Sequence, residues 1–220
     1  MAQMPRDSDS SDKHKGTVRR HMRLCKAVKG ADFLIANIEP HYTRLVGTMS
    51  DKEKANEAED DAQDDRDLRG REGADVLRTV SERAKQNDRD MPGDGAFARV
   101  YPEGGFSEFV ASNGTTSAAS CRLIAGRIRD LGQNHPLASY EAELEAKAVA
   151  IDDAQKGLDN ALRARKLAEA EDELAQAALR RAYEENWLDA QKKFGKAAAE
   201  RLFPRLRKRA SSGGDDGGET

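Results

Sequence analysis

Residues 136–162 read PLASYEAELEAKAVAIDDAQKGLDNAL, and the spacing of their apolar side chains indicates the class of fold. Four apolar side chains recur in it at seven-residue steps: Leu137, Leu144, Ile151 and Leu158. Such a repeat forms the buried stripe of a helix that packs against another helix in a bundle or coiled coil. Pro136 suits a first helical position, and the next proline is Pro204. The sequence therefore predicts long helical structure through this region.

The heptad phase slips after Leu162, and Leu167 and Leu174 start a new register. A third register holds the aromatic residues Tyr183, Trp187 and Phe194, which are interpreted as core packing. Helix-weakening residues stand near the slip: Gly157, Asp159 and Asn160. We expect a hairpin of two helices that turns between residues 157 and 165. The alternative is one helix over residues 136–203, about 100 Å long at 1.5 Å per residue.

The N-terminal half carries two further heptad series, Leu24-Ala31-Ile38-Leu45 and Val28-Ile35-Tyr42-Met49. Their register continues through Pro40, which predicts one kinked helix; a break at Glu39 is the alternative. Gly47 offers a C-cap, and Ser50 and Glu53 have capping-box spacing. A second helix, antiparallel to the first, is therefore expected from Asp51.

Residues 51–67 open that second helix with nine acidic and three basic side chains and only alanine as apolar content. Such a stretch has almost nothing to bury, so we expect it either to project beyond the bundle or to fray. An apolar face returns in the residues after it, although Gly70 and Gly73 each cost about 1 kcal/mol relative to Ala in a helix.

A helical break at residues 91–95 precedes two β-prone runs, residues 97–101 and 106–110, which flank a Pro/Gly turn. They predict a β-hairpin connector, with an irregular apolar loop as the alternative. A short third helix follows residues 113–116. Its apolar face is expected from Cys121, Ile124, Ile128 and Leu131, and Gly132 is expected to end it.

The predicted fold is all-α, with two long antiparallel helical hairpins of the four-helix-bundle or coiled-coil type, a short third helix, an irregular or β-hairpin connector, and disordered termini. The boundaries are a disordered tail at 1–14, a helical hairpin at 15–90, the connector at 91–114, and the short helix plus a long hairpin or single helix at 115–203, which packs with 15–90 as one domain. Residues 204–220 form a basic and then Gly/Asp-rich tail that is also expected to be disordered. The expected core is Leu24, Val28, Ile35, Ile38, Leu45, Leu77, Val80, Ile124, Ile128, Leu144, Ile151, Leu158, Leu174, Tyr183, Trp187 and Phe194.

Bulk composition narrows the function classes. Charged residues make up 35% of the chain, yet the formal net charge is only -3, which argues against a strongly basic nucleic-acid coat protein. No run of residues reaches the 18 to 20 apolar positions of a membrane span, and the first 15 residues lack the apolar core of a secretory signal. Two isolated cysteines, Cys25 and Cys121, predict buried, inert, reduced thiols and a cytoplasmic protein.

Catalytic and metal-binding patterns are absent from the sequence. His14 and His21 stand seven residues apart, and without a third ligand they are interpreted as solvated surface side chains. No Glu-x-x-His pair, phosphate-binding glycine loop, zinc-protease motif or nucleophile elbow occurs. We therefore expect no enzymatic activity, no cofactor and no metal.

Two surfaces are candidates for binding. The first is a recognition loop made by Tyr101, Pro102, Glu103, Gly104 and Gly105. The second is a set of cations near the C-terminus that could contact an anionic partner: Arg201, Arg205, Arg207, Lys208 and Arg209. Residues 1–30 are also basic, with eight cations and three carboxylates.

Sustained heptads and missing catalytic motifs favour a non-enzymatic helical structural or protein-interaction module. Its partner would be an unknown protein or a second copy of the chain. The alternative is a phosphate-seeking adaptor that binds nucleic acid or an anionic membrane surface through its basic termini.

Overall fold

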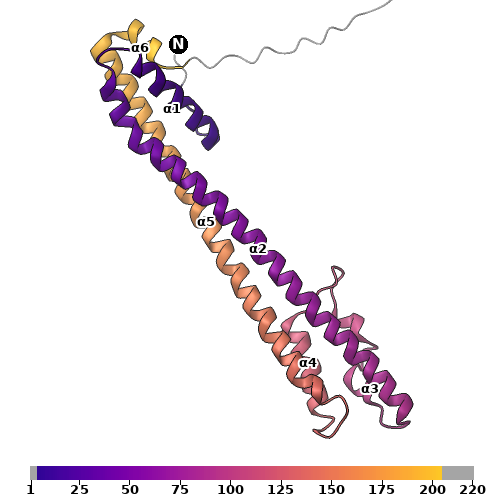
Figure 1. Cartoon of the computed structure of the whole chain (residues 1–220). Coiled ribbons are helices and arrows are strands. Elements are labelled where there is room, and N and C mark those ends of the chain that lie inside the picture. Colours follow the sequence, from indigo (N-terminus) through magenta and orange to yellow (C-terminus); the bar gives the residue numbers. More distant parts are fainter. Residues whose placement is uncertain (1–3, 205–220) are drawn as a thin grey trace, which may run out of the picture. The chain divides into compact units, whose positions relative to one another are not determined.

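The computed structural model describes residues 4–204, and every regular element among them is helical (Figure 1). In chain order these are α1 (Ser11–Lys26), α2 (Asp32–Asp90), α3 (Ala96–Val100), the 3-10 helix η1 (Phe106–Phe109), α4 (Ala118–Arg129), α5 (Ser139–Phe194) and α6 (Lys196–Leu202). The predicted all-α class is confirmed. None of these helices has an apolar stretch long enough to cross a bilayer.

Both expected hairpin turns are wrong, because α2 and α5 are continuous helices of 59 and 56 residues. At the first expected turn, Thr48 donates a hydrogen bond to Asp172 of α5 at 3.2 Å, and Lys52 lies 3.9 Å from the same carboxylate. At the second, Arg165 of α5 pairs with Glu59 of α2. Contacts to a partner helix thus continue through each predicted turn and outweigh the local glycine signals. Of the two alternatives for residues 136–203, the long helix is the closer one.

The chain divides into two compact units. Unit 1 contains the residues up to Lys52 and those from Ala168 onward, and unit 2 runs from Glu53 to Leu167. Each unit therefore combines part of α2 with part of α5. The single domain expected over residues 15–203 stays a prediction.

Unit 1 pairs the first part of α2 with the last part of α5 in antiparallel order, and α1 and α6 pack in the same unit (Figure 1). α2 continues through Pro40, as the heptad register predicts. The buried apolar residues of unit 1 include Val18, Cys25, Leu34, Ile38, Leu45, Leu179, Tyr183, Leu202 and Phe203. The aromatic residues Trp187 and Phe194 are half-buried against this core.

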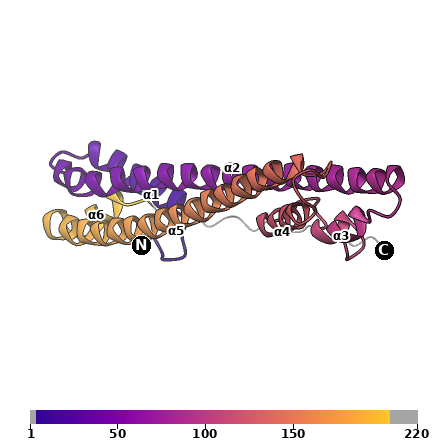
Figure 2. The ribbon, with the colours of Figure 1, turned by 90° about the horizontal axis from the view of Figure 1, so that it is seen from below.

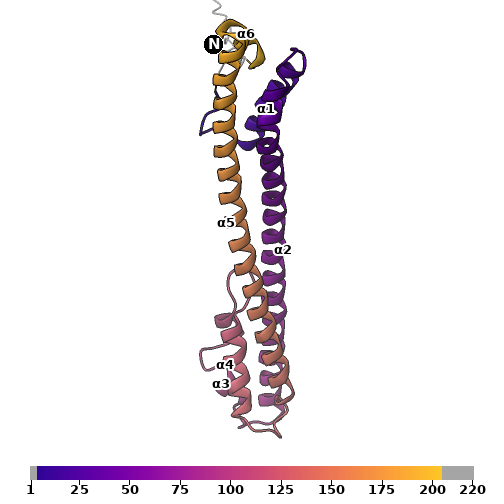
Figure 3. The same ribbon diagram turned by 90° about the vertical axis from the view of Figure 1, so that its left-hand side faces the viewer.

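Unit 2 packs α3 and α4 beside the C-terminal part of α2 and the first part of α5 (Figures 2 and 3). Its buried core includes Leu77, Val80, Val100, Tyr101, Cys121, Ile124, Ile128, Leu137, Leu144 and Ile151. The third helix lies where the sequence predicts it, and Ser117 caps its first turn by accepting a hydrogen bond from the Ser120 N–H.

Gly70 and Gly73 have a packing role in unit 2. The Thr116 N–H donates to the Gly70 carbonyl at 3.0 Å, which brings the chain before α4 against α2. A Cβ at Gly73 would lie 2.8 Å from Cγ2 of Thr116 and 3.3 Å from Sγ of Cys121. The missing side chains therefore permit this close approach.

The N-terminal boundaries differ from the prediction. α1 begins at Ser11, inside the expected disordered tail, with Ser10 as its N-cap. It ends at Lys26, and Gly30 has a positive φ of 83° before α2 starts at Asp32. This break interrupts the predicted heptad series, so Leu24 and Val28 are exposed rather than buried. Leu174 is also exposed, at 63%, and Ile35 is half-buried.

The predicted β-hairpin connector is wrong. Residues 96–100 form α3 and residues 106–109 form η1, and the strand-like feature of the segment is an isolated bridge between Val110 and Thr116. Side chains of both runs pack on the unit 2 core, and helical turns allow this packing without an unpaired strand edge. The irregular alternative describes the segment better.

The acidic stretch of α2 is helical although it buries nothing. Between Leu45 and Gly70, no residue of α2 is fully buried. Charged pairs take the place of a core there, as between Glu59 and Arg165 or between Arg69 and Asp65.

Candidate functional site

The inner face of α1 holds the densest group of buried polar side chains in unit 1. His14 and His21 are 1% and 0% exposed, so the interpretation of both as solvated surface residues is wrong. The two histidines share the buried stripe of α1 with Thr17, Val18 and Cys25. Their burial can be predicted from the sequence, because these five positions fall at helical three- and four-residue spacing.

His21 is fully engaged by its neighbours. Its Nδ1–H donates to the Leu202 carbonyl at 2.8 Å, and its Nε2 lies 3.3 Å from the Asn186 side-chain amide. That amide also donates to the Leu34 carbonyl at 2.7 Å, and the Phe203 ring stacks on the imidazole. Burial lowers the pKa of His21, and the hydrogen bond to Leu202 opposes this shift. The ring is a neutral link between α1, α5, α6 and the start of α2.

Cys25 and His21 do not form an activated thiol pair, although their Sγ and Nδ1 atoms are 3.7 Å apart. Burial raises the pKa of the Cys25 thiol to about 12, and the charge of Asp32 adds to the shift. A nucleophilic cysteine requires the opposite, a lowered pKa and a base with a free nitrogen. Cys121 of unit 2 is likewise buried, with a pKa raised to about 11 by burial. The predicted buried thiols are confirmed.

His14 differs from His21 because neither of its ring nitrogens has a hydrogen-bond partner of normal geometry among the described residues. Burial lowers its pKa, and the nearby guanidinium of Arg180 adds to the shift, while the Asp9 carboxylate and backbone oppose it. The Tyr183 hydroxyl is also buried without a partner in the described chain. Buried polar groups without hydrogen bonds such as these lower the stability of unit 1.

Asp172 is a buried carboxylate that holds the start of α1. It is 1% exposed and accepts hydrogen bonds from Ser11 at 2.7 Å, Thr48 at 3.2 Å and Gln176 at 3.0 Å. Lys52 supplies the compensating charge at 3.9 Å. These partners come from α1, α2 and α5, so the carboxylate joins three helices of unit 1 rather than offering itself to a ligand.

Two side chains of the expected recognition loop are held by contacts within unit 2. Tyr101 is 1% exposed, and its hydroxyl donates to the Leu77 carbonyl at 2.7 Å. Glu103 accepts two hydrogen bonds from Arg127, which also donates to the Val100 carbonyl. Pro102 and Gly104 are exposed, and Gly105 is buried. The structure therefore uses this loop to fasten the end of α3 to α4.

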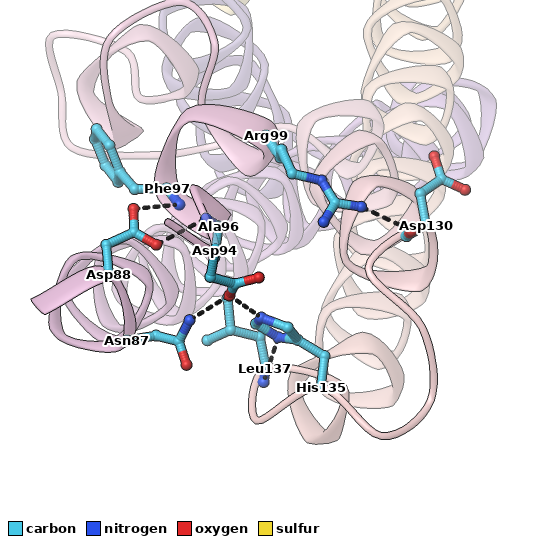
Figure 4. Close-up of polar contacts among 9 residues, drawn as sticks. All are labelled: Asn87, Asp88, Asp94, Ala96, Phe97, Arg99, Asp130, His135 and Leu137. Atoms are coloured by element: carbon cyan, nitrogen blue, oxygen red, sulfur yellow. Dashed lines mark hydrogen bonds and ion pairs between the residues drawn. The ribbon is translucent and has the colours of Figure 1, made fainter. Parts of the chain in front are cut away.

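A second histidine contact, between His135 and Asp94, lies in unit 2 where the loop after α2 meets the loop before α5 (Figure 4). His135 lies 2.9 Å from Asp94 through Nε2, and its Nδ1 accepts a hydrogen bond from the Leu137 N–H at 3.1 Å. Asn87 donates to the same Asp94 carboxylate. The hydrogen bond from His135 lowers the pKa of Asp94.

This Asp-His pair resembles part of a catalytic triad, but it has no nitrogen left for a substrate. Nδ1 is occupied by a backbone N–H, and Nε2 is the donor to Asp94. A general base must accept a proton from the reacting group, and this ring cannot do so while both contacts are made. The pair holds the loop after α2 against the loop before α5.

The outer face of α1 is a different kind of surface. Arg19, Arg20, Arg23 and Lys26 are all exposed there. Asp12 is the only carboxylate on the helix. Among residues 4–204, no ion pair is formed by any of these four cations. The excess of positive charge in residues 1–30 is evident from the sequence, but its position on one helix face is not.

The predicted C-terminal cations are only partly visible. Arg201 is exposed on α6, whereas Arg205, Arg207, Lys208 and Arg209 lie outside the described residues. Pro204, the last described residue, lines a small surface cavity with Arg20, Arg23 and Leu24.

Unit 2 has an open cleft of about 640 Å³ between η1, the start of α4 and α5. Its lining mixes small and polar side chains, including Arg66, Thr116, Ser120 and Gln155. Asp152, also in the lining, is already paired with Arg122. In the part of the chain that the structure describes, no three His, Cys, Asp or Glu side chains gather as metal ligands. Comparison with protein-family models, with curated proteins and with solved structures finds no match to this chain.

Proposed function

We propose that the protein is a non-enzymatic helical interaction module that associates with a second copy of itself through α5. The observation that carries this proposal is the exposure of large apolar side chains on that helix. In unit 1, Leu174 and Leu188 are 63% and 54% exposed, and they stand two heptads apart on one face. The opposite face of the same segment is buried through Leu179 and Tyr183.

Unit 2 repeats the pattern on its own part of α5. Val149 and Leu167 are 52% and 62% exposed, and eighteen residues, or five helical turns, separate them. Exposed leucines at helical spacing favour pairing with another helix. A second copy supplies such a helix, because its α5 carries the same row and a two-fold pair is self-complementary.

The buried polar groups support a role without catalysis. Both thiols have raised pKa values, and the rings of His21 and His135 are occupied by structural hydrogen bonds. Reduced, buried cysteines also fit the cytoplasm, which we propose as the location of the protein.

Light scattering of the full chain at several concentrations tests self-association. We expect the mass to rise toward twice that of one chain as concentration increases. The double variant Leu174→Gln/Leu188→Gln should remove this dependence, since the exposed row on α5 loses apolar surface. The matched control Leu68→Gln/Leu123→Gln changes leucines that are 49% and 47% exposed on α2 and α4, and it should associate like the wild type. A single-chain mass at every concentration contradicts the proposal.

A second candidate function is binding to nucleic acid or an anionic membrane surface. The four exposed cations on the outer face of α1 favour it, together with Arg201 of α6. These cations are not part of the exposed apolar row on α5, so binding of a polyanion and self-association use different residues.

A further inference from the structure

The outer face of α1 concentrates positive charge without a visible structural purpose. Arg19, Arg23 and Lys26 follow one another at four- and three-residue spacing, and Arg20 lies beside them. Side chains at this spacing are neighbours on a helix, and like charges there destabilise it. The opposite face of α1 is fully used by the fold, with Val18, His21 and Cys25 at 0% exposure. A bound anion would relieve the repulsion that the fold leaves in place.

Pro204, the last described residue, lies beside the same face. Pro204 lines a cavity of about 380 Å³ together with Arg20, Arg23 and Leu24. The sequence continues from Pro204 as Arg-Leu-Arg-Lys-Arg over residues 205–209. In the sequence, a second run of cations therefore follows directly after a residue that lines a cavity with the arginines of α1.

We propose that this outer face of α1, defined by Arg19, Arg20, Arg23 and Lys26, binds the phosphate backbone of double-stranded nucleic acid without reading its sequence. The inference rests on the second candidate function and names its partner. Arg19 to Lys26 covers about 10 Å of helix axis. A duplex presents one negative charge per about 1.7 Å along its axis, so each of the four cations can face a phosphate.

Two observations favour a duplex over the other polyanions. A membrane-surface helix inserts a broad apolar face, but the main apolar stripe of α1 is buried in unit 1, and Leu24, at 37%, is the one exposed large apolar side chain of that helix. Single strands are held by stacking bases on aromatic rings, and no residue of α1 is Phe, Tyr or Trp.

Fluorescence anisotropy of a labelled 20-base-pair DNA duplex, titrated with the full chain between 50 and 200 mM salt, tests the assignment. For four phosphate contacts, the slope of log K against log salt should be about -3.6. The variant Arg19→Gln/Arg23→Gln should make the slope shallower by about 2 and weaken binding about tenfold or more at 50 mM salt.

The matched control is Arg163→Gln/Lys166→Gln, which removes the same charge from exposed positions of α5. It should bind within twofold of the wild type. Equal losses in both variants overturn the assignment to α1, because net charge alone would then explain binding. Tighter binding to vesicles that contain phosphatidylserine than to the duplex overturns the nucleic-acid partner and keeps the adaptor function. No binding to either at 50 mM salt overturns both.

Discussion

His14 and His21 lie on the same buried face of α1 but differ in what surrounds their rings. His21 has a carbonyl, an amide and an aromatic ring as partners, whereas the nitrogens of His14 make no hydrogen bond of normal geometry in the described chain. A buried polar group without a hydrogen bond costs about 1–3 kcal/mol, and an apolar side chain of similar size removes that cost. The two residues should therefore respond oppositely to the same substitution.

We expect His14→Leu to raise the free energy of unfolding by about 1 kcal/mol at pH 7.5, because it removes an unsatisfied imidazole. His21→Leu should lower it by about 2 kcal/mol, since the Leu202 carbonyl and the Asn186 amide lose a partner. Urea denaturation followed by fluorescence of Trp187, the single tryptophan and part of unit 1, measures both. A destabilised His14→Leu would mean that the ring has a partner after all.

Acid should destabilise unit 1 through the same two histidines. Their pKa values are lowered in the folded chain, mainly by burial, so below about pH 6.5 the unfolded chain takes up protons first. The contribution of the neutral histidines to the free energy of unfolding is fully present above that pH. It falls as the pH drops toward their lowered pKa values in the folded chain. The urea midpoint reported by Trp187 should decrease from pH 7.5 to pH 5.5, and less steeply in His14→Leu. An unchanged wild-type midpoint would contradict this linkage.

At the scale of elements, glycines in the two long helices have unequal surroundings. A Cβ at Gly73 would press on Thr116, Ile151 and Cys121, whereas Gly47 has nothing within 4 Å of that position. Helix propensity favours alanine over glycine by about 1 kcal/mol at both sites. Packing opposes it at Gly73 alone.

We expect Gly47→Ala to stabilise the protein by up to about 1 kcal/mol and Gly73→Ala to destabilise it by about 1–2 kcal/mol. Thermal unfolding followed by circular dichroism at 222 nm compares the two variants with the wild type. Stabilisation by both substitutions would show that the segment at Thr116 moves aside at little cost.

These elements show where sequence patterns succeed and fail. The heptads through Ile38, Leu45, Leu144 and Ile151 correctly identify buried helical stripes. Local glycines and capping residues at 47–50 and 157–160 wrongly predict turns, because their helical state depends on a partner helix that a local pattern does not contain. The inner histidines could be found from spacing alone, but the cavity that Arg20 and Arg23 line with Pro204 could not, since 181 or more residues separate Pro204 from the two arginines.

Over the described residues, fully buried side chains are distributed in two cores, one in each unit, and a long stretch of α2 adds only half-buried side chains to them. Residues 46–69 contribute no fully buried side chain, although they are helical throughout. Short isolated helices are marginal in water, and packing usually supplies most of their stability. That stretch therefore depends on charged pairs with the same chain.

Hydrogen exchange should reveal the difference. We expect amides of residues 50–66 to exchange at least tenfold faster than those of residues 34–45 and 74–84, because opening there exposes no core. Exchange followed by mass spectrometry of peptides from the full chain at pH 7 measures this. Equal protection along α2 would mean that the helix opens only when both cores unfold.

Each core also contains one thiol, Cys25 in unit 1 and Cys121 in unit 2, and both are completely shielded from solvent. A thiol-specific reagent can reach either sulfur only when the unit around it opens. The rate of labelling at each cysteine therefore reports how often the unit around it opens. With a single-cysteine variant for each site, the opening of the two units can be timed separately without any engineered probe.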